Sequence, residues 1–152
     1  METTNTKFID IKEVKRDWHL VDAKRKTLGR LASQISRYLQ GKHKVEYAPH
    51  MDVGDYVLVI NARDVKITGK KLVQKYYYHY SGYPGGLKAT PLIKVLEKHP
   101  ERVLEKAVRL MLPKTTLGRK MYRRLKVYAG PLHPHSAQEP LPVDITKERR
   151  EA

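Results

Sequence analysis

The sequence predicts an α/β domain in which a small, largely parallel sheet is flanked by helices. Residues 18–22 are strand-like, the apolar residues from Leu28 to Leu39 recur at helical spacing, and residues 56–60 are a continuous apolar run. A run without alternation is typical of a parallel strand that is buried on both faces. Strand, helix and strand in this order form a βαβ unit, whose crossover is expected to be right-handed.

The length and composition fit one domain with extended ends. The chain has 152 residues, 40% of them hydrophobic, which is enough for a core without a disulfide or a metal. It has no cysteine, which excludes a disulfide scaffold, a zinc ribbon and a thiol nucleophile. We expect an N-terminal arm over residues 1–17, the α/β domain over 18–140 and a C-terminal tail over 141–152.

The first helix has recognisable start and stop residues. Thr27 is a plausible N-cap before the helical pattern, and Gly41 follows the pattern as a stop. Residues 42–54 are expected to be a loop before the buried strand. Residues 65–68 have strand-forming side chains and predict a further strand.

The remaining chain is predicted to be mainly helical after an extended, tyrosine-rich segment. Residues 72–80 are expected to be extended, and glycine and proline make residues 81–86 a loop. Proline positions then predict helices over 91–98 and from Pro100 to Pro113, followed by a helix that opens at Thr116, a strand at 126–128 and a proline-rich surface segment after Gly130. The apolar faces are expected to be Val103, Leu104, Ala107, Val108 and Met111 in the second of these helices, and Leu117, Met121 and Leu125 in the third.

Charge is strongly unbalanced along the chain. There are 31 Lys and Arg against 16 Asp and Glu, a formal net charge of +15. Three stretches, 23–45, 65–96 and 106–138, contain no acid and hold 21 of the 31 basic residues. Ordinary soluble surfaces mix the two signs, whereas basic fields of this kind attract polyanions.

The expected polyanion is nucleic acid rather than a membrane surface. No apolar run is long enough to span a bilayer, and the N-terminus lacks the order of a secretory signal. The aromatic residues are ten Tyr, one Trp and one Phe, and the Tyr cluster in basic segments rather than opposite a basic helix face. Tyrosine offers a flat ring to bases and a hydroxyl group to phosphate.

A four-residue motif, Thr-Leu-Gly-Arg, occurs at 27–30 and again at 116–119. Each copy lies at a predicted helix start, where Thr can cap and Gly leaves backbone N–H groups open to an anion. An Arg in the first turn opposes the helix dipole, which favours an external phosphate. The alternative is an ordinary capped helix with a solvated Arg.

Three other basic segments are candidates for phosphate contact. Lys42-His43-Lys44 suits phosphate, or merely complements the preceding helix dipole. Residues 70–88 combine lysines, glycines and five tyrosines within eight positions, and about half of these tyrosines are expected to face inward. Residues 114–126 carry six cations and no acid, and a helix would place Arg119, Arg123 and Lys126 on one face.

The sequence offers little for an enzyme. His133-Pro134-His135 is too short and constrained for a good chelate, and there is no nucleophile elbow and no dinucleotide-binding motif. His50, Asp52 and Asp55 could form an acid/base group or could cap the loop before the buried strand. We expect no catalysis, no cofactor, no metal and no small-molecule substrate.

Between Trp18 and Pro140 the chain contains a series of short sequence blocks that together resemble those of a known family. The blocks are Val21-Asp22-Ala23, Thr27-Leu28-Gly29-Arg30-Leu31-Ala32-Ser33, Gly41-Lys42-His43-Lys44, Tyr47-Ala48-Pro49-His50, Gly54-Asp55-Tyr56-Val57, Val59-Ile60-Asn61-Ala62, Thr68-Gly69-Lys70-Lys71, Ser81-Gly82-Tyr83-Pro84-Gly85-Gly86, Met111-Leu112-Pro113-Lys114, Leu117-Gly118-Arg119, Leu125-Lys126-Val127-Tyr128-Ala129-Gly130 and His133-Pro134-His135. With these blocks the chain resembles the L-thirteen family of large-subunit ribosomal proteins, in its bacterial form. It departs from the family at His79 and Tyr80, where a basic residue and then His are usual, and in a longer, more acidic start.

The resemblance implies a three-layer α/β fold, binding to large-subunit rRNA, an early role in subunit assembly, contacts with neighbouring ribosomal proteins and a cytoplasmic location as a monomer within the ribosome. The alternative is a regulatory mRNA-binding protein that uses the same surface off the ribosome. From the motifs and the resemblance, the candidate RNA-binding residues are Lys24, Lys26, Thr27, Gly29, Arg30, Arg37, Lys42, His43, Lys44, Lys70, Lys71, Lys75, Tyr76, Tyr78, His79, Tyr80, Ser81, Gly82, Tyr83, Gly85, Gly86, Lys88, Lys114, Gly118, Arg119, Lys120, Arg123, Arg124, Lys126, His133 and His135.

Overall fold

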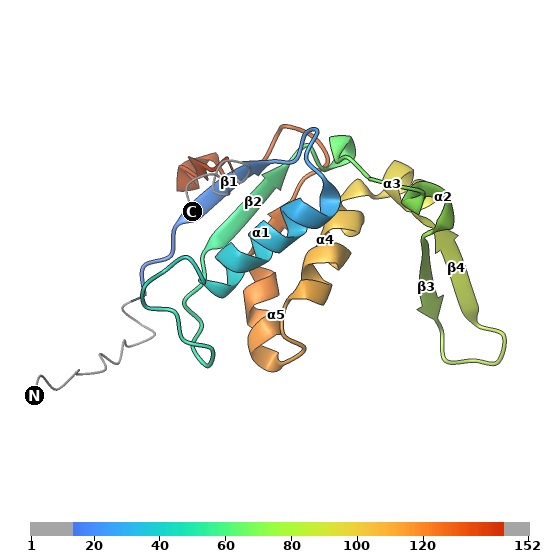
Figure 1. Ribbon diagram of the computed structural model, residues 1–152, viewed down its shortest axis with the longest axis horizontal. Helices are drawn as coiled ribbons and strands as arrows, with labels where there is room; N and C mark the ends of the chain where they lie inside the picture. Colours follow the sequence, from blue (N-terminus) through green and yellow to red (C-terminus); the bar gives the residue numbers. More distant parts are fainter. Residues whose placement is uncertain (1–13, 145–152) are drawn as a thin grey trace, which may run out of the picture.

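The predicted α/β class is confirmed by a computed structural model, which describes residues 14–144. The main sheet has four strands in the order β5-β2-β1-β6, every neighbouring pair is parallel, and helices flank the sheet (Figure 1). These strands are β1 (Trp18–Asp22), β2 (Tyr56–Ile60), β5 (Leu125–Val127) and β6 (Leu141–Pro142). Most of the predicted arm, residues 1–13, and the end of the predicted tail, residues 145–152, lie outside the described residues.

Helix α1 (Leu28–Gln40) connects β1 to β2, as predicted. Thr27 stands at the N-cap position, but its side chain makes no capping hydrogen bond. Gly41 ends the helix in the left-handed region, at φ 78°, which glycine adopts without strain. The buried stripe of α1 includes Leu31 and Ile35, so the helical period in the sequence marks the face toward the core.

Strand β2 is buried on both faces, as its unbroken apolar run predicts. Val57, Leu58 and Val59 are all fully buried. Because successive side chains point to opposite faces of a sheet, Leu58 lies on the other face from its two neighbours. Val57 and Val59 belong to the main core, which also contains Leu31 of α1 and Leu104.

Three helices follow in the second half of the chain: α3 (Leu92–Lys98), α4 (Pro100–Met111) and α5 (Thr116–Arg123). Helix α4 packs against α1 and α3, and Val103, Leu104 and Val108 are buried as predicted. The prediction for Met111 is wrong, because this side chain is 42% exposed. Leu112, the residue after the helix, packs in the core instead.

The strand predicted at residues 65–68 does not form. This segment follows a short 3₁₀ turn, Ala62–Asp64, and makes a single bridge between Lys66 and Thr27. The Lys66 N–H donates to the Lys26 carbonyl, and its own carbonyl accepts from the Leu28 N–H. Those two bonds tie the segment to the chain entering α1, and no ladder continues beyond them.

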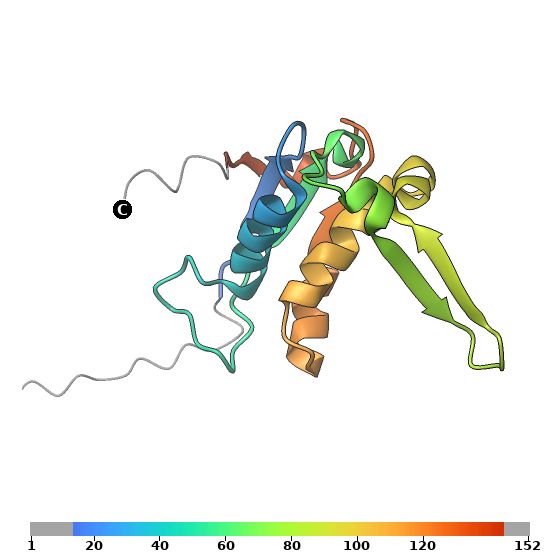
Figure 2. The same cartoon turned by 45° about the vertical axis from the view of Figure 1, so that its right-hand side comes forward.

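Residues 71–91 form a hairpin that stands apart from the main sheet. One helical turn, α2 (Lys71–Gln74), precedes β3 (Tyr76–Tyr80), and β4 (Leu87–Pro91) pairs with β3 antiparallel. Figures 1 and 2 both show this hairpin projecting from the body. Neither α2 nor β4 is predicted by the sequence pattern, and Pro91 ends β4 rather than opening α3, because the β3 partner keeps this segment extended.

The C-terminal part differs from prediction by small shifts. Strand β5 begins one residue early, at Leu125, so this side chain belongs to the sheet rather than to α5. Lys126 therefore does not share a helix face with Arg119 and Arg123. A 3₁₀ turn (Ser136–Gln138) leads to β6, which adds a short edge next to β1.

Candidate nucleic-acid interface

The hairpin presents tyrosine rings to solvent. Tyr76, Tyr78 and Tyr80 alternate along β3 and are exposed, whereas Tyr77 is half-buried. Cross-strand partners share a face, so Ala89 and other small or apolar residues of β4 line the same outer surface. The expectation that half of the tyrosines face inward is wrong, because Tyr76, Tyr78 and Tyr80 occupy alternate positions on the outer face of β3 and leave only Tyr77 on the face toward the body.

A basic hollow lies between the hairpin, α4 and α5, with a volume of about 840 Å³. We call it the α5 hollow. Tyr77, Tyr78, Leu110, Leu112 and Tyr122 supply its aromatic and apolar parts. Its cations are Lys106, Arg109, Lys114, Arg119 and Arg123. Among the described residues that line it there is no Asp or Glu, so a positive field fills a concave surface.

The start of α5 forms one wall of this hollow. The cap is Thr115 rather than the predicted Thr116, and its hydroxyl accepts a hydrogen bond of 3.3 Å from the Gly118 N–H. A Cβ on Gly118 would lie 1.9 Å from the Pro113 carbonyl oxygen, so packing demands glycine here. At the other copy of the motif, a Cβ on Gly29 would meet nothing within 4 Å. The two glycines therefore have different roles.

Two basic residues after α1, His43 and Lys44, lie around a buried carboxylate. The Asp55 side chain is fully buried, and its Oδ2 lies 2.8 Å from His43 Nε2 and 3.1 Å from His19 Nε2. Its Oδ1 accepts from Lys44 and, at 3.1 Å, from the Asp17 N–H. Burial raises the pKa of Asp55, but the hydrogen bonds from His19, Lys44 and Asp17 outweigh burial and hold it well below the ordinary carboxyl value.

This cluster is also the one group within residues 14–144 that could hold a metal ion. The ligand atoms of His19, His43 and Asp55 lie within 4.8 Å of one another. However, four donors already surround the carboxylate, and one of them is the Lys44 ammonium group. His19 Nδ1 is buried without a partner, whereas a metal-bound histidine normally donates from its second nitrogen. The donors fit a closed polar cluster better than a metal site.

Arg124 is predicted from the sequence to be a free RNA-binding residue, and this prediction is wrong because the side chain is buried and bonded inside the protein. Its side chain binds Asp52 through two hydrogen bonds of 2.5 and 2.6 Å and donates to the Leu39 carbonyl at 3.1 Å. It is only 6% exposed. Asp52 and Asp55 thus anchor the loop before β2, the structural alternative left open by the sequence, and His50 is exposed.

The other candidate residues divide into exposed and engaged groups. The exposed ones are Lys24, Gly29, Arg30, Arg37, Lys42, Lys70, Lys71, Lys75, Tyr76, Tyr78, His79, Tyr80, Ser81, Gly82, Tyr83, Gly85, Lys88, Lys114, Arg119, Lys120, Arg123 and Lys126. Thr27, Gly86 and His133 are half-buried. Lys26 pairs with Asp144 at 3.3 Å, and His135 Nε2 lies 2.9 Å from the Tyr128 hydroxyl.

Sequence reasoning missed Lys106 and Arg109. Both lie in an acid-free stretch, at i and i+3 on α4, and line the α5 hollow. Their spacing opposite the apolar face of the helix is the signal that could have identified them.

The fold and this surface define a small, basic α/β protein whose cations collect on a concave face next to exposed tyrosines. Across the described part of the chain, no helix is both long and apolar enough to cross a membrane. The family model "Ribosomal protein L13" matches residues 16–134. The chain belongs to this family of ribosomal proteins, as its motifs predict.

Curated relatives carry the name "Large ribosomal subunit protein uL13". The protein of Nitrosococcus oceani is 60% identical over 134 residues, covering 88% of this chain and 94% of the relative. Those of Thermobifida fusca and Thermotoga maritima are 56% and 58% identical over 140 residues, covering 92% of this chain and 94% of each relative.

Proposed function

We propose that this protein is a structural constituent of the large ribosomal subunit that binds large-subunit rRNA and performs no catalysis. The observation that carries the proposal is the α5 hollow, a concave surface lined by five cations and, among the described residues, no acid. Membership of a ribosomal protein family supports the same proposal.

The contacts would divide between affinity and shape. The Lys and Arg side chains of the hollow neutralise phosphates, which provides most of the affinity and positions the protein on the RNA. The exposed rings of Tyr76, Tyr78 and Tyr80 offer stacking surfaces for unpaired bases beside those cations. The α/β core holds both sets in place and takes no direct part.

The proposed function also includes where the protein acts and when it joins the ribosome. Within the cytoplasm the protein joins the large subunit as a monomer, early in assembly, and contacts neighbouring ribosomal proteins as well as rRNA. Sedimentation of the cellular protein tests this part. We expect it in large-subunit particles and in their early precursors, whereas a protein found only in free messenger complexes would contradict the proposal.

Salt dependence of rRNA binding tests the central claim. The dissociation constant for a large-subunit rRNA fragment should be measured between about 50 and 300 mM KCl, because log K falls linearly with log salt when phosphate contacts dominate. Each phosphate contact contributes about 0.7–0.9 to the slope of log K against log salt, so five cations predict a slope near −4. A flat dependence would contradict electrostatic rRNA binding.

A further inference from the structure

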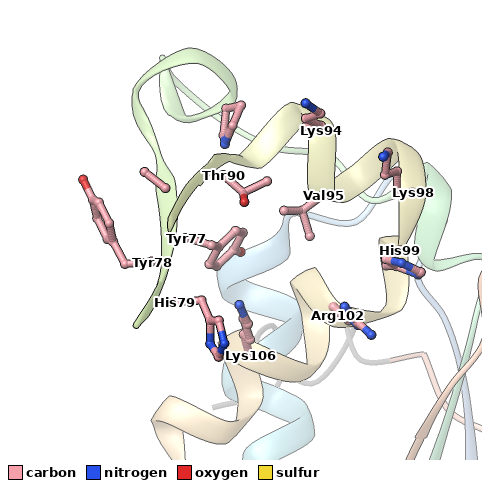
Figure 3. Close-up of a pocket in the computed structure, with 12 residues that line it drawn as sticks. Tyr77, Tyr78, His79, Thr90, Lys94, Val95, Lys98, His99, Arg102 and Lys106 are labelled. Atoms are coloured by element: carbon pink, nitrogen blue, oxygen red, sulfur yellow. The ribbon is translucent and has the colours of Figure 1, made fainter. Parts of the chain in front are cut away.

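A second hollow lies on the other side of Tyr77, between the hairpin and helices α3 and α4 (Figure 3). We call it the α3 hollow, and its volume is about 570 Å³. In Figure 3, Tyr77 and Val95 extend into the space between β3 and α3, while Tyr78 turns away. Its basic lining residues are Lys94, Lys98, Arg102, Lys106, His79 and His99. No described residue of its lining is an Asp or a Glu.

The acids of the same two helices lie elsewhere. Glu97, Glu101 and Glu105 alternate with the cations along the sequence, which gives this segment a balanced charge pattern. None of the three lines the hollow. The fold therefore separates the charges of α3 and α4 and directs one sign into a concave surface.

Three of these cations have no hydrogen-bond or ion-pair partner within the described residues. The side chains of Lys94, Lys98 and Arg102 make no hydrogen bond and no ion pair with any residue from 14 to 144. Lys94 and Lys98 are four residues apart on one helix, as are Arg102 and Lys106 on the next, and like charges at this spacing destabilise a helix. Arg102 also lies in the first turn of α4, where the helix dipole opposes a cation. An anion bound beside these side chains would offset both unfavourable terms.

Tyr77 forms the wall between the two hollows. Two ammonium groups lie over its ring: that of Lys106 is 4.4 Å from the ring centroid, and that of Lys75 is 5.3 Å from it. Tyr77, Tyr78 and Lys106 line both hollows. A polyanion that crosses the α5 hollow therefore reaches the α3 hollow without leaving the positive surface, which favours a nucleic-acid strand over a free ion.

We propose that the α3 hollow is a phosphate-binding pocket that takes a phosphodiester group of the RNA backbone, held by Lys98 and Arg102 with Lys94 and Lys106 beside them. This pocket rests on the proposed rRNA binding and adds to it a contact under the hairpin, on residues of α3 and α4 that the sequence motifs do not mark. Its size is in the range of small-ligand pockets, about 300–1,000 Å³.

The test compares two charge-matched variants. Lys98→Gln with Arg102→Gln removes two cations of the pocket, and Arg63→Gln with Lys66→Gln removes two exposed cations that line neither hollow. Binding of the same rRNA fragment is measured over a salt series. We expect the salt slope to fall by about one in the pocket variant and to stay unchanged in the control. We also expect the pocket variant to unfold in urea at a midpoint equal to or above that of the wild type, because like-charge repulsion is removed.

Two further measurements distinguish RNA phosphate from free phosphate, and distinguish failure of the pocket from failure of rRNA binding as a whole. Side-chain NMR signals of Val95 and His99 should shift with an rRNA fragment and much less with inorganic phosphate alone. If inorganic phosphate alone saturates the NMR shifts of Val95 and His99, and the salt slope of rRNA binding is unchanged in the pocket variant, the pocket is a free-anion site and the proposal is overturned. Normal rRNA binding by the pocket variant, with loss from assembled particles, would identify a protein partner and overturn it too. If the wild type itself fails to bind rRNA, the proposed function fails first.

Discussion

Two basic regions of this molecule look alike in sequence and differ in the structure. One surrounds the loop after α1, where His43, Lys44 and Arg124 all bind the carboxylates of Asp52 and Asp55. The other lines the hollows beside the hairpin, where no described lining residue is acidic. The first region uses its cations to hold the fold together, and the second leaves them free for a partner.

The comparison shows why a basic stretch cannot be assigned from sequence alone. Arg124 follows directly after Arg123 in an acid-free stretch, yet it pairs with Asp52, 72 positions earlier. Burial then decides how much each pair stabilises, because a desolvated ion pair is strongly coupled and an exposed one is screened by water.

The largest effect is expected from Asp55→Asn. The substitution removes the buried negative charge that four donors share, and removing one partner of a buried ion pair costs about 3 kcal/mol or more. Urea unfolding at pH 7 measures it, and the midpoint of thermal unfolding should fall by roughly 6–12 °C. Asp64→Asn, at an exposed acid, is the control and should behave as the wild type. Equal stability of the two variants would contradict a structural role for Asp55.

Acid should weaken the same cluster. Because the pKa of Asp55 is lower in the folded state than the ordinary value of about 3.9, its contribution to stability is complete above that value and is lost as the pH falls toward the folded pKa. The free energy of unfolding of the wild type should therefore decrease between about pH 4 and pH 2. In Asp55→Asn the decrease should be smaller, and parallel curves for the two proteins would show that Asp55 does not carry the effect.

Arg124→Gln should destabilise the fold without changing RNA contact. It removes two hydrogen bonds to Asp52 and one to the Leu39 carbonyl, for an expected loss of about 2 kcal/mol. Arg123→Gln, at the neighbouring exposed position, should change stability by less than about 0.5 kcal/mol. Urea denaturation measures both. A lower rRNA salt slope for Arg124→Gln, measured where it is folded, would contradict its assignment to the first region.

Arg119→Glu combined with Arg123→Glu should produce the opposite pattern. Both side chains line the α5 hollow and are exposed, so the fold should stay within about 0.5 kcal/mol of the wild type. The salt slope of rRNA binding should fall by about two, because each arginine is expected to neutralise one phosphate. Unfolding of this variant would show instead that these arginines are structural.

The smallest effect is expected from Gly29→Ala. The site is exposed and a Cβ would meet nothing within 4 Å, so alanine should stabilise α1 by about 0.5–1 kcal/mol. If the backbone of this turn contacts phosphate, the methyl group should weaken rRNA binding at the same time. Gly118→Ala is the contrasting variant, and it should lose stability because its Cβ would overlap the Pro113 carbonyl oxygen.

Local pattern was sufficient for the elements whose signals are short-range. The apolar spacing of α1, the unbroken run of β2 and Pro100 at the start of α4 each predict the observed element. In each, periodicity or the fixed φ of proline acts within the segment itself. Elements that form only because another strand lies beside them are not predicted by local pattern: β4 pairs with β3 across a short loop, and β6 pairs with β1, which is far away in the chain.

Local periodicity, ordered motifs and net charge can be read along the chain, and they were enough to predict the α/β core and the family and to indicate a polyanionic partner. Which cations remain free depends on the folded arrangement. Folding brings Arg124 to Asp52, 72 positions away, and Lys44 to Asp55 across the loop after α1. The packing of α3 and α4 under the hairpin places Lys98 and Arg102, but none of the neighbouring glutamates, in the lining of the hollow. The physical reason is that ion pairing and concavity depend on distances in space, which position along the chain does not fix.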